Sequence, residues 1–101
     1  DARQTAEEAA GALRALAGRI QAIERGRNAA PAREQAALDA AVRKLREQLD
    51  EGIEGYGELV AAASRAVAAA ASSDGLATSK QALTDATDHL AGLAMALREL
   101  S

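Results

Sequence analysis

The chain has 101 residues, of which 49% are apolar and 27% charged, and its formal net charge at pH 7 is −3. It contains no cysteine, which excludes disulfides and thiolate metal sites, and its slight acidic excess gives no general attraction to nucleic acid or to an anionic membrane. No run of 18 apolar residues occurs, so we expect no membrane span within this segment.

Alanine makes up most of the apolar content: there are 29 alanines but only 20 larger apolar side chains, 12 of them leucine. Each alanine buries little surface, so we expect a thin core and helices that approach one another closely. Sustained helical periodicity and the low net charge argue against a disordered chain. The expected consequence is modest stability, improved by pairing with a second copy.

The first predicted helix is marked by apolar residues at alternating steps of three and four, which is a heptad pattern. Its members are Ala6, Ala9, Leu13, Leu16, Ile20 and Ile23. Thr5 and Glu8 form a predicted capping box at its start. Gly26 and Asn28 are predicted to end it, and Pro31 suits the opening turn of the next helix.

The same heptad pattern continues in the middle segment. Its members are Leu38, Val42, Leu45 and Leu49. Asp39, Arg43 and Glu47 stand at four-residue spacing on the predicted solvent face of this helix.

Three glycines then fall within residues 52–57 and would cost a continuous helix roughly 3 kcal/mol relative to alanine. An apolar pattern can still be followed through this stretch, with a slipped step after Leu49. It comprises Ile53, Tyr56, Val60, Ala63, Val67 and Ala70. Two architectures follow: a break at 52–57 gives four short helices, whereas a kinked continuation gives one long central helix between two shorter ones. We favour the break.

A turn is predicted at residues 72–75, where the sequence reads Ser-Ser-Asp-Gly. The last helix follows, with Thr78 and Gln81 as its predicted cap. Its heptad positions hold Leu76, Leu83, Ala86, Leu90, Leu93, Leu97 and Leu100. Connections this short place successive helices antiparallel.

We therefore predict a single all-α domain over residues 1–101, folded as an antiparallel up-and-down helical bundle. The heptad residues with the largest side chains are expected to form its core or an interface. They are Leu13, Leu16, Ile20, Ile23, Leu38, Val42, Leu45, Leu49, Tyr56, Leu83, Leu90, Leu93 and Leu97.

The residues that usually carry chemistry do not form a recognisable set. His89 is the only histidine, so a histidine metal cluster or a catalytic triad lacks the parts it needs. The carboxylates between Glu47 and Glu58 have no predicted base beside them, and we interpret them as a solvated acidic stretch. We therefore expect a non-enzymatic chain without metal or cofactor. Arg14 and Arg19 are the candidates for binding a small anionic ligand at a subunit interface.

One resemblance covers about half of the chain. Residues 57–100 resemble the last two helices of the extracytoplasmic four-helix-bundle sensor domains of bacterial chemoreceptors and histidine kinases. The likeness lies in the Tyr-Gly-Glu-Leu-Val stretch at 56–60, the alanine-rich helix after it, the turn at 72–75 and the leucine-spaced final helix. It implies a sensor placed between two membrane helices. The start at Asp1 rather than Met is what a processed or excised segment would show.

Two further resemblances imply other roles. Small helical proteins exported by type VII secretion are alanine-rich acidic hairpins with Trp-x-Gly in the bend, where this chain has Ile53-Glu54-Gly55. The stretch around His89 resembles the phosphoacceptor site of histidine phosphotransfer domains, but lacks their lysine. A half-exposed histidine on an amphipathic helix is the simpler interpretation.

The leading hypothesis is a bacterial sensor or signalling module that acts through helix–helix contacts as a homodimer, on the extracytoplasmic side of the membrane. Ligand binding near the interface would then shift the helices by small sliding or rotating steps. The alternative is a ligand-free adaptor or assembly module. Neither hypothesis includes a nucleic-acid partner.

Overall fold

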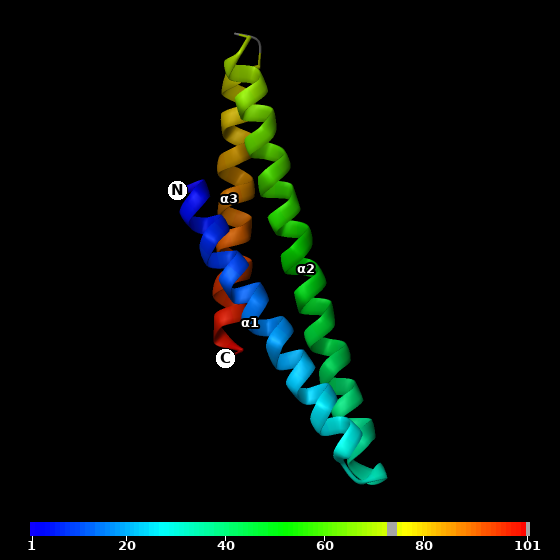
Figure 1. The fold of residues 1–101 in the computed structure, drawn as a ribbon. Helices are drawn as coiled ribbons and strands as arrows, with labels where there is room; N and C mark the ends of the chain where they lie inside the picture. The colour runs from blue at the N-terminus through cyan, green and yellow to red at the C-terminus, as the bar shows by residue number, and fades with distance from the viewer. Residues whose placement is uncertain (73–74, 101) are drawn as a thin grey trace.

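The computed structural model describes residues 1–72 and 75–100, which form three helices (Figure 1). They are α1 (Ala2–Ala29), α2 (Ala32–Ala70) and α3 (Leu76–Glu99). Successive helices run in opposite directions and form a rod of 62 × 17 × 16 Å. The predicted all-α up-and-down bundle is confirmed, in its form with a long central helix. No helix in the described residues is both long and apolar enough to cross a membrane.

α1 begins earlier than its predicted capping box. Asp1 is the N-cap, and its carboxylate accepts a hydrogen bond of 2.8 Å from the backbone N–H of Gln4. Thr5 lies inside the first turn, so its predicted capping role is wrong. At the other end α1 reaches Ala29 before Pro31 caps α2, because an isolated Gly26 costs too little to stop a helix that is packed along one side.

The favoured break at residues 52–57 is also wrong, because α2 is continuous through all three glycines. Two of them, Gly52 and Gly55, are buried where the other helices pack closest, so packing offsets their low helix propensity. The heptad pattern also needs no slip after Leu49. It continues directly to Gly52 and, one heptad later, to Leu59, which is 2% exposed.

α3 starts at Leu76, directly after Gly75, whose φ of +77° lies in the left-handed region that favours glycine. The predicted cap at Thr78 is wrong, because this residue lies within the helix. Residues 73 and 74 of the predicted turn lie outside the described residues.

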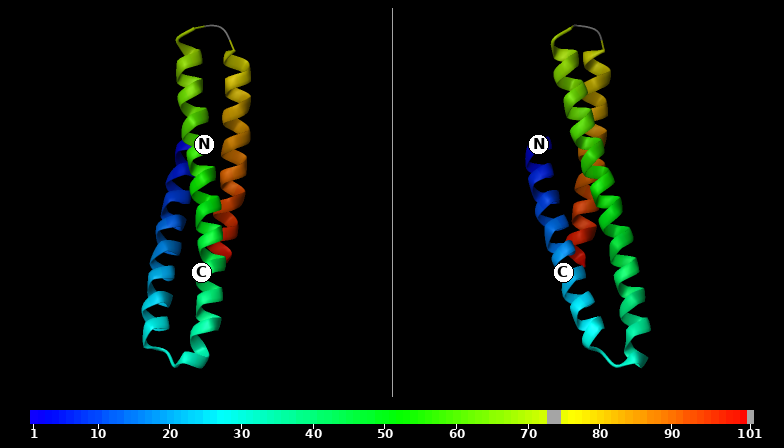
Figure 2. Two further views of the ribbon diagram at one scale, coloured as in Figure 1. Left: turned by 90° about the vertical axis from the view of Figure 1, so that its right-hand side faces the viewer. Right: turned by 45° about the vertical axis from the view of Figure 1, so that its right-hand side comes forward.

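The two outer helices cover different stretches of α2. α1 packs along its N-terminal part and α3 along its C-terminal part, so three helices lie side by side only in the middle of the rod (Figures 1 and 2). The core is confined to that overlap and consists of two small clusters. One contains Ala9, Leu59, Leu90 and Ala94, and the other contains Leu16, Ile20 and Leu97. Each end of the rod is therefore a two-helix hairpin.

Candidate functional site

Two buried glycines let the outer helices approach the middle of α2. A β-carbon on Gly52 would lie 2.5 Å from Cδ2 of Leu13 and 3.3 Å from Cδ1 of Leu97. A β-carbon on Gly55 would lie 2.6 Å from Cδ1 of Leu93. Leucines from α1 and α3 thus fill the notches that the glycines leave, and this close packing fixes the level at which the helices overlap.

Two ion pairs join α1 to α2 near their connection. Arg27 forms a bidentate pair with Asp39, with Nε–Oδ1 at 2.8 Å and Nη2–Oδ2 at 3.2 Å. The hydrogen bond from Arg27 lowers the pKa of Asp39, and the bond to Asp39 raises the pKa of Arg27. Nη2 of Arg46 also lies 2.9 Å from Oε2 of Glu24. Asp39, which the sequence pattern places on the solvent face, therefore helps hold the hairpin in register.

The other two helix pairs each carry one looser ion pair. Arg98 of α3 lies 3.5 Å from Glu8 of α1, and Nδ1 of His89 lies 3.4 Å from Oε2 of Glu58 on α2. The histidine pair is ionic only when the imidazole is protonated, and both side chains are more than half exposed. His89 is thus an accessible contact residue between α2 and α3.

The predicted core or interface residues are all at least partly buried. Leu16, Ile20, Leu90 and Leu97 are buried. The remaining positions are partly buried, namely Leu13, Ile23, Leu38, Val42, Leu45, Leu49, Tyr56, Leu83 and Leu93.

The two predicted ligand-binding arginines do not come together. Arg14 and Arg19 are five residues apart on α1, which points their side chains about 140° apart around the helix. Arg19 instead donates a hydrogen bond from Nη1 to the carbonyl oxygen of Leu100, at the end of α3. Together they provide no shared anion site.

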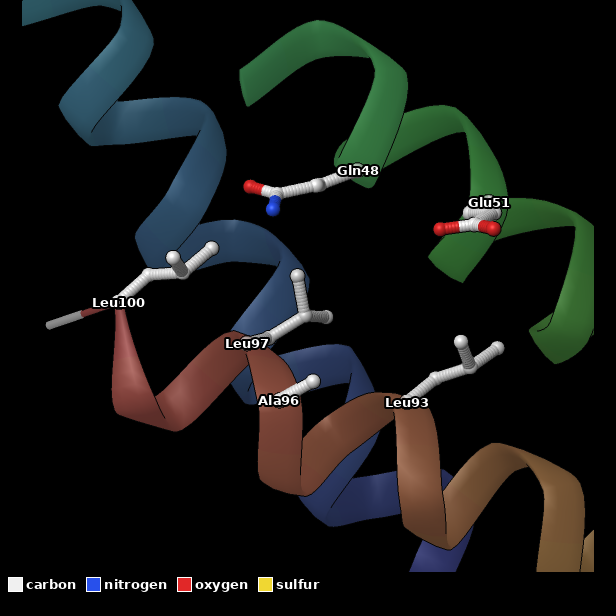
Figure 3. Close-up of a pocket in the computed structure, with 6 residues that line it drawn as sticks. All are labelled: Gln48, Glu51, Leu93, Ala96, Leu97 and Leu100. Carbon is white, nitrogen blue, oxygen red and sulfur yellow. The ribbon is translucent and has the colours of Figure 1, made fainter. Parts of the chain in front are cut away.

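A small pocket lies between α2 and α3 near the C-terminal end of α3, with about 310 Å³ of empty space that includes open solvent (Figure 3). Gln48 and Glu51 of α2 face three leucines of α3 across it. The side-chain oxygen of Gln48 is buried and has no hydrogen-bond partner among the described residues. We call this the Gln48 pocket; it is apolar apart from the Gln48 amide, whose oxygen is unpartnered, and the carboxylate of Glu51.

The outward face of α2 carries an apolar stripe that neither outer helix covers. Ile53, Val60 and Val67 are 54%, 50% and 73% exposed and stand seven residues apart. On average they lie about 110° around α2 from the buried Gly52, Leu59 and Ala62. Small residues fall four positions after each of them, and all six make up what we call the outer stripe. Its members are Ile53, Gly57, Val60, Ser64, Val67 and Ala71.

The described residues hold no group of three or more His, Cys, Asp or Glu side chains placed to bind a metal ion. The carboxylates between Glu47 and Glu58 are all exposed and spread along α2. The candidate features for function are therefore the outer stripe, the Gln48 pocket and the ion pairs between helices.

Residues 1–100 match the Rv2743c family. The chain belongs to this family. No curated protein and no solved structure matches the chain significantly. For this member of the Rv2743c family, the arguments about function therefore rest on its own residues.

The apolar pattern in the sequence of this Rv2743c-family chain does not predict that the outer stripe is exposed. The slipped apolar pattern places Ile53, Val60 and Val67 on the packed face, because it steps from Leu49 to Ile53 and passes over the glycines at 52 and 55. The unslipped pattern through Gly52 and Leu59 is also present in the sequence, and it leaves those three residues outside the core.

Proposed function

We propose that this chain is a non-catalytic helical interaction module, which works through helix–helix contacts with a second copy of itself. The observation that carries the proposal is the outer stripe: three β-branched side chains at heptad spacing, each at least half exposed, on a helix that already packs another face against α1 and α3. Helices with two apolar faces are typical of assemblies in which the second face meets another helix.

The shape of the molecule supports the same proposal. Its radius of gyration is 17.6 Å, whereas a compact domain of this length has about 13 Å. Its core is confined to two small clusters in the three-helix overlap. A rod with little core and much open helix surface gains more from an added helix than a globular domain does.

A sensing role, as in the extracytoplasmic sensor hypothesis, is the second candidate, and the Gln48 pocket favours it. An apolar pocket with one unpartnered acceptor and a carboxylate fits the chemistry of a small alkylammonium ion. Butylammonium chloride should then raise the melting temperature of the wild type more than equimolar sodium chloride does, and should lose this effect in Gln48→Met. Equal melting temperatures in the two salts would end the sensing candidate.

Sedimentation equilibrium tests the leading proposal. We expect the apparent mass to rise with concentration from the 10.3 kDa of one chain toward twice that value. A constant monomer mass up to millimolar concentration would contradict self-association, whatever surface is considered.

A further inference from the structure

We infer that the outer stripe binds the outer stripe of a second copy in antiparallel orientation, with residue 62 of both chains at the level of the two-fold axis. This inference rests on the proposed self-association and adds to it the surface and the direction of pairing. In the left panel of Figure 2 the α2 ribbon lies in front of α1 and α3, so one side of this helix is not covered by either of them. Neither outer helix covers the outer stripe, as the exposure of Ile53, Val60 and Val67 shows.

The order of side chains along the stripe determines the orientation. Large and small residues alternate, as Ile53, Gly57, Val60, Ser64, Val67 and Ala71. With the axis at the level of residue 62 in an antiparallel pair, every large side chain faces a small one of the other copy. Ile53 then faces Ala71, Val60 faces Ser64, and Val67 faces Gly57. At each level along the pair, one large and one small side chain then share the space between the two helices, so the interface is filled evenly.

A parallel pair with the same stripe packs poorly. Each residue would then face its own copy, so Val60 would meet Val60 and Gly57 would meet Gly57. Layers that are too full would alternate with layers that leave a void, and both faults weaken packing. The antiparallel arrangement is therefore the one that this sequence of side chains fits.

The polar atoms in the stripe are already satisfied within α2. The hydroxyl of Ser64 donates a hydrogen bond of 2.9 Å to the backbone oxygen of Val60, one turn earlier in the same helix. Burying it beneath a second helix would therefore leave no hydroxyl unpartnered. On one flank stand Glu54, Ala61 and Ala68, and on the other stand Tyr56, Ala63 and Ala70. Four of these six residues are alanines, which let two helices approach closely along the C-terminal part of the stripe.

Charge does not oppose the same arrangement, because none of the six stripe residues is charged. Glu58 and Arg65 lie about 120–140° around α2 from the middle of the stripe and face away from the second copy. Glu58 already lies 3.4 Å from His89 of α3.

The rod shape leaves the chain with more exposed surface than a compact monomer has. Its surface is 6504 Å², whereas a compact monomer of this mass exposes about 5,400 Å². The excess of about 1,100 Å² belongs to the whole rod, and it exceeds the ~800 Å² that each partner contributes to a standard interface.

Single-cysteine variants test the orientation, because the wild type has no cysteine. Ile53→Cys and Ala71→Cys each place one thiol at an end of the stripe. In an antiparallel pair of Ile53→Cys chains the two thiols lie about 27 Å apart, since 18 helical residues separate their levels. In a mixed pair, the thiol at position 53 of one copy faces the thiol at position 71 of the other. A short thiol-to-thiol linker should therefore join an equimolar mixture of the two variants and leave each variant alone mostly unlinked.

Every result of this experiment bears on the inference. Linkage only in the mixture supports it, and linkage of Ile53→Cys to itself would overturn it in favour of parallel pairing. If the mixture is not linked although sedimentation shows a dimer, the stripe is not the interface. In that case the proposed self-association stands and this inference fails.

A matched pair of charge variants tests the surface independently of any cross-link. Val60→Asp puts a carboxylate at the centre of the stripe, whereas Met95→Asp puts one at a 61% exposed apolar residue of α3, outside it. We expect Val60→Asp to raise the dimer dissociation constant about 100-fold or more and Met95→Asp to leave it nearly unchanged. Circular dichroism should show wild-type helix content in both. Equal weakening by both variants would contradict the stripe; Val67→Asp, at a 73% exposed residue, provides a second variant that spares the core.

Discussion

At the scale of single residues, the side chains of this molecule differ in how far the sequence reveals their roles. Leu16, Ile20 and Leu90 are buried, and heptad spacing alone points to them. The pairing of Arg27 with Asp39 could not be found in this way, because it depends on how two helices are aligned across a connection. Likewise, nothing in the spacing of Gln48 shows that its oxygen is buried without a partner among the described residues.

Gln48→Met should stabilise the fold. Methionine keeps the unbranched shape of glutamine but has no strong acceptor to bury, so the desolvation penalty of the unpartnered oxygen disappears. We expect the free energy of unfolding to rise by about 1–3 kcal/mol in urea denaturation. A loss of stability would mean that an ordered water or a ligand satisfies this oxygen in the wild type.

Asp39→Asn should make stability less sensitive to acid. Because the pKa of Asp39 is lowered in the folded chain, its ion pair with Arg27 stabilises the fold above the ordinary aspartate pKa, and this contribution is lost as the pH falls through the lowered value. The variant should therefore be less stable than the wild type at pH 7, and the gap should narrow as the pH falls toward 2.

The matched control for this change is Asp50→Asn, at an exposed aspartate of α2 that joins no ion pair in the described part of the chain. Chemical denaturation at several pH values measures both variants. A gap between wild type and Asp39→Asn that stays constant from pH 7 to pH 2 would show that the ion pair contributes nothing.

At the scale of helices, α2 is the element whose full length the sequence does not predict. The all-helical content, the Pro31 boundary and the turn near Gly75 follow from composition and periodicity. Continuity through 52–57 does not, because the helix propensity of glycine argues for a break. It depends on leucines from two other helices that fill the notches at Gly52 and Gly55. Only tertiary packing carries that information.

Substitutions of two glycines should therefore have opposite effects. Gly52→Val places side-chain atoms where Leu13 and Leu97 already lie, and overpacking of this kind lowers stability by about 1–3 kcal/mol. Gly18→Ala, at an exposed position of α1 with open space around it, should raise stability by up to about 1 kcal/mol through helix propensity. Thermal unfolding followed by circular dichroism measures both. Stabilisation by Gly52→Val would show that α1 and α3 do not pack tightly against this notch.

At the scale of the whole molecule, the stagger of α1 and α3 along α2 concentrates stability in the middle. The three-helix overlap contains both core clusters, while each end of the rod is a hairpin of two helices. The same stagger leaves one side of α2 free along its length, which is where the outer stripe lies. A thin core and an open apolar face are thus two results of one arrangement.

Amide hydrogen exchange should show that local stability falls from the middle of the rod toward its two ends. In the Val60→Asp variant, which we expect to stay monomeric, the amides around Gly52–Leu59 should be the best protected. Those at 21–29 and 76–82, in the two-helix ends, should exchange about tenfold faster or more, because local opening there breaks fewer contacts. Uniform protection along the rod would contradict the confinement of the core to the overlap.

Small-angle X-ray scattering of the wild-type dimer tests the central claim most directly. Residue 62 lies near one end of a rod 62 Å long, so antiparallel pairing about it leaves most of each rod projecting in opposite directions. We expect a maximum dimension of about 95 Å, since some 32 helical residues extend beyond the axis on each side. A dimer close to the 62 Å of the single chain would contradict antiparallel pairing through the outer stripe.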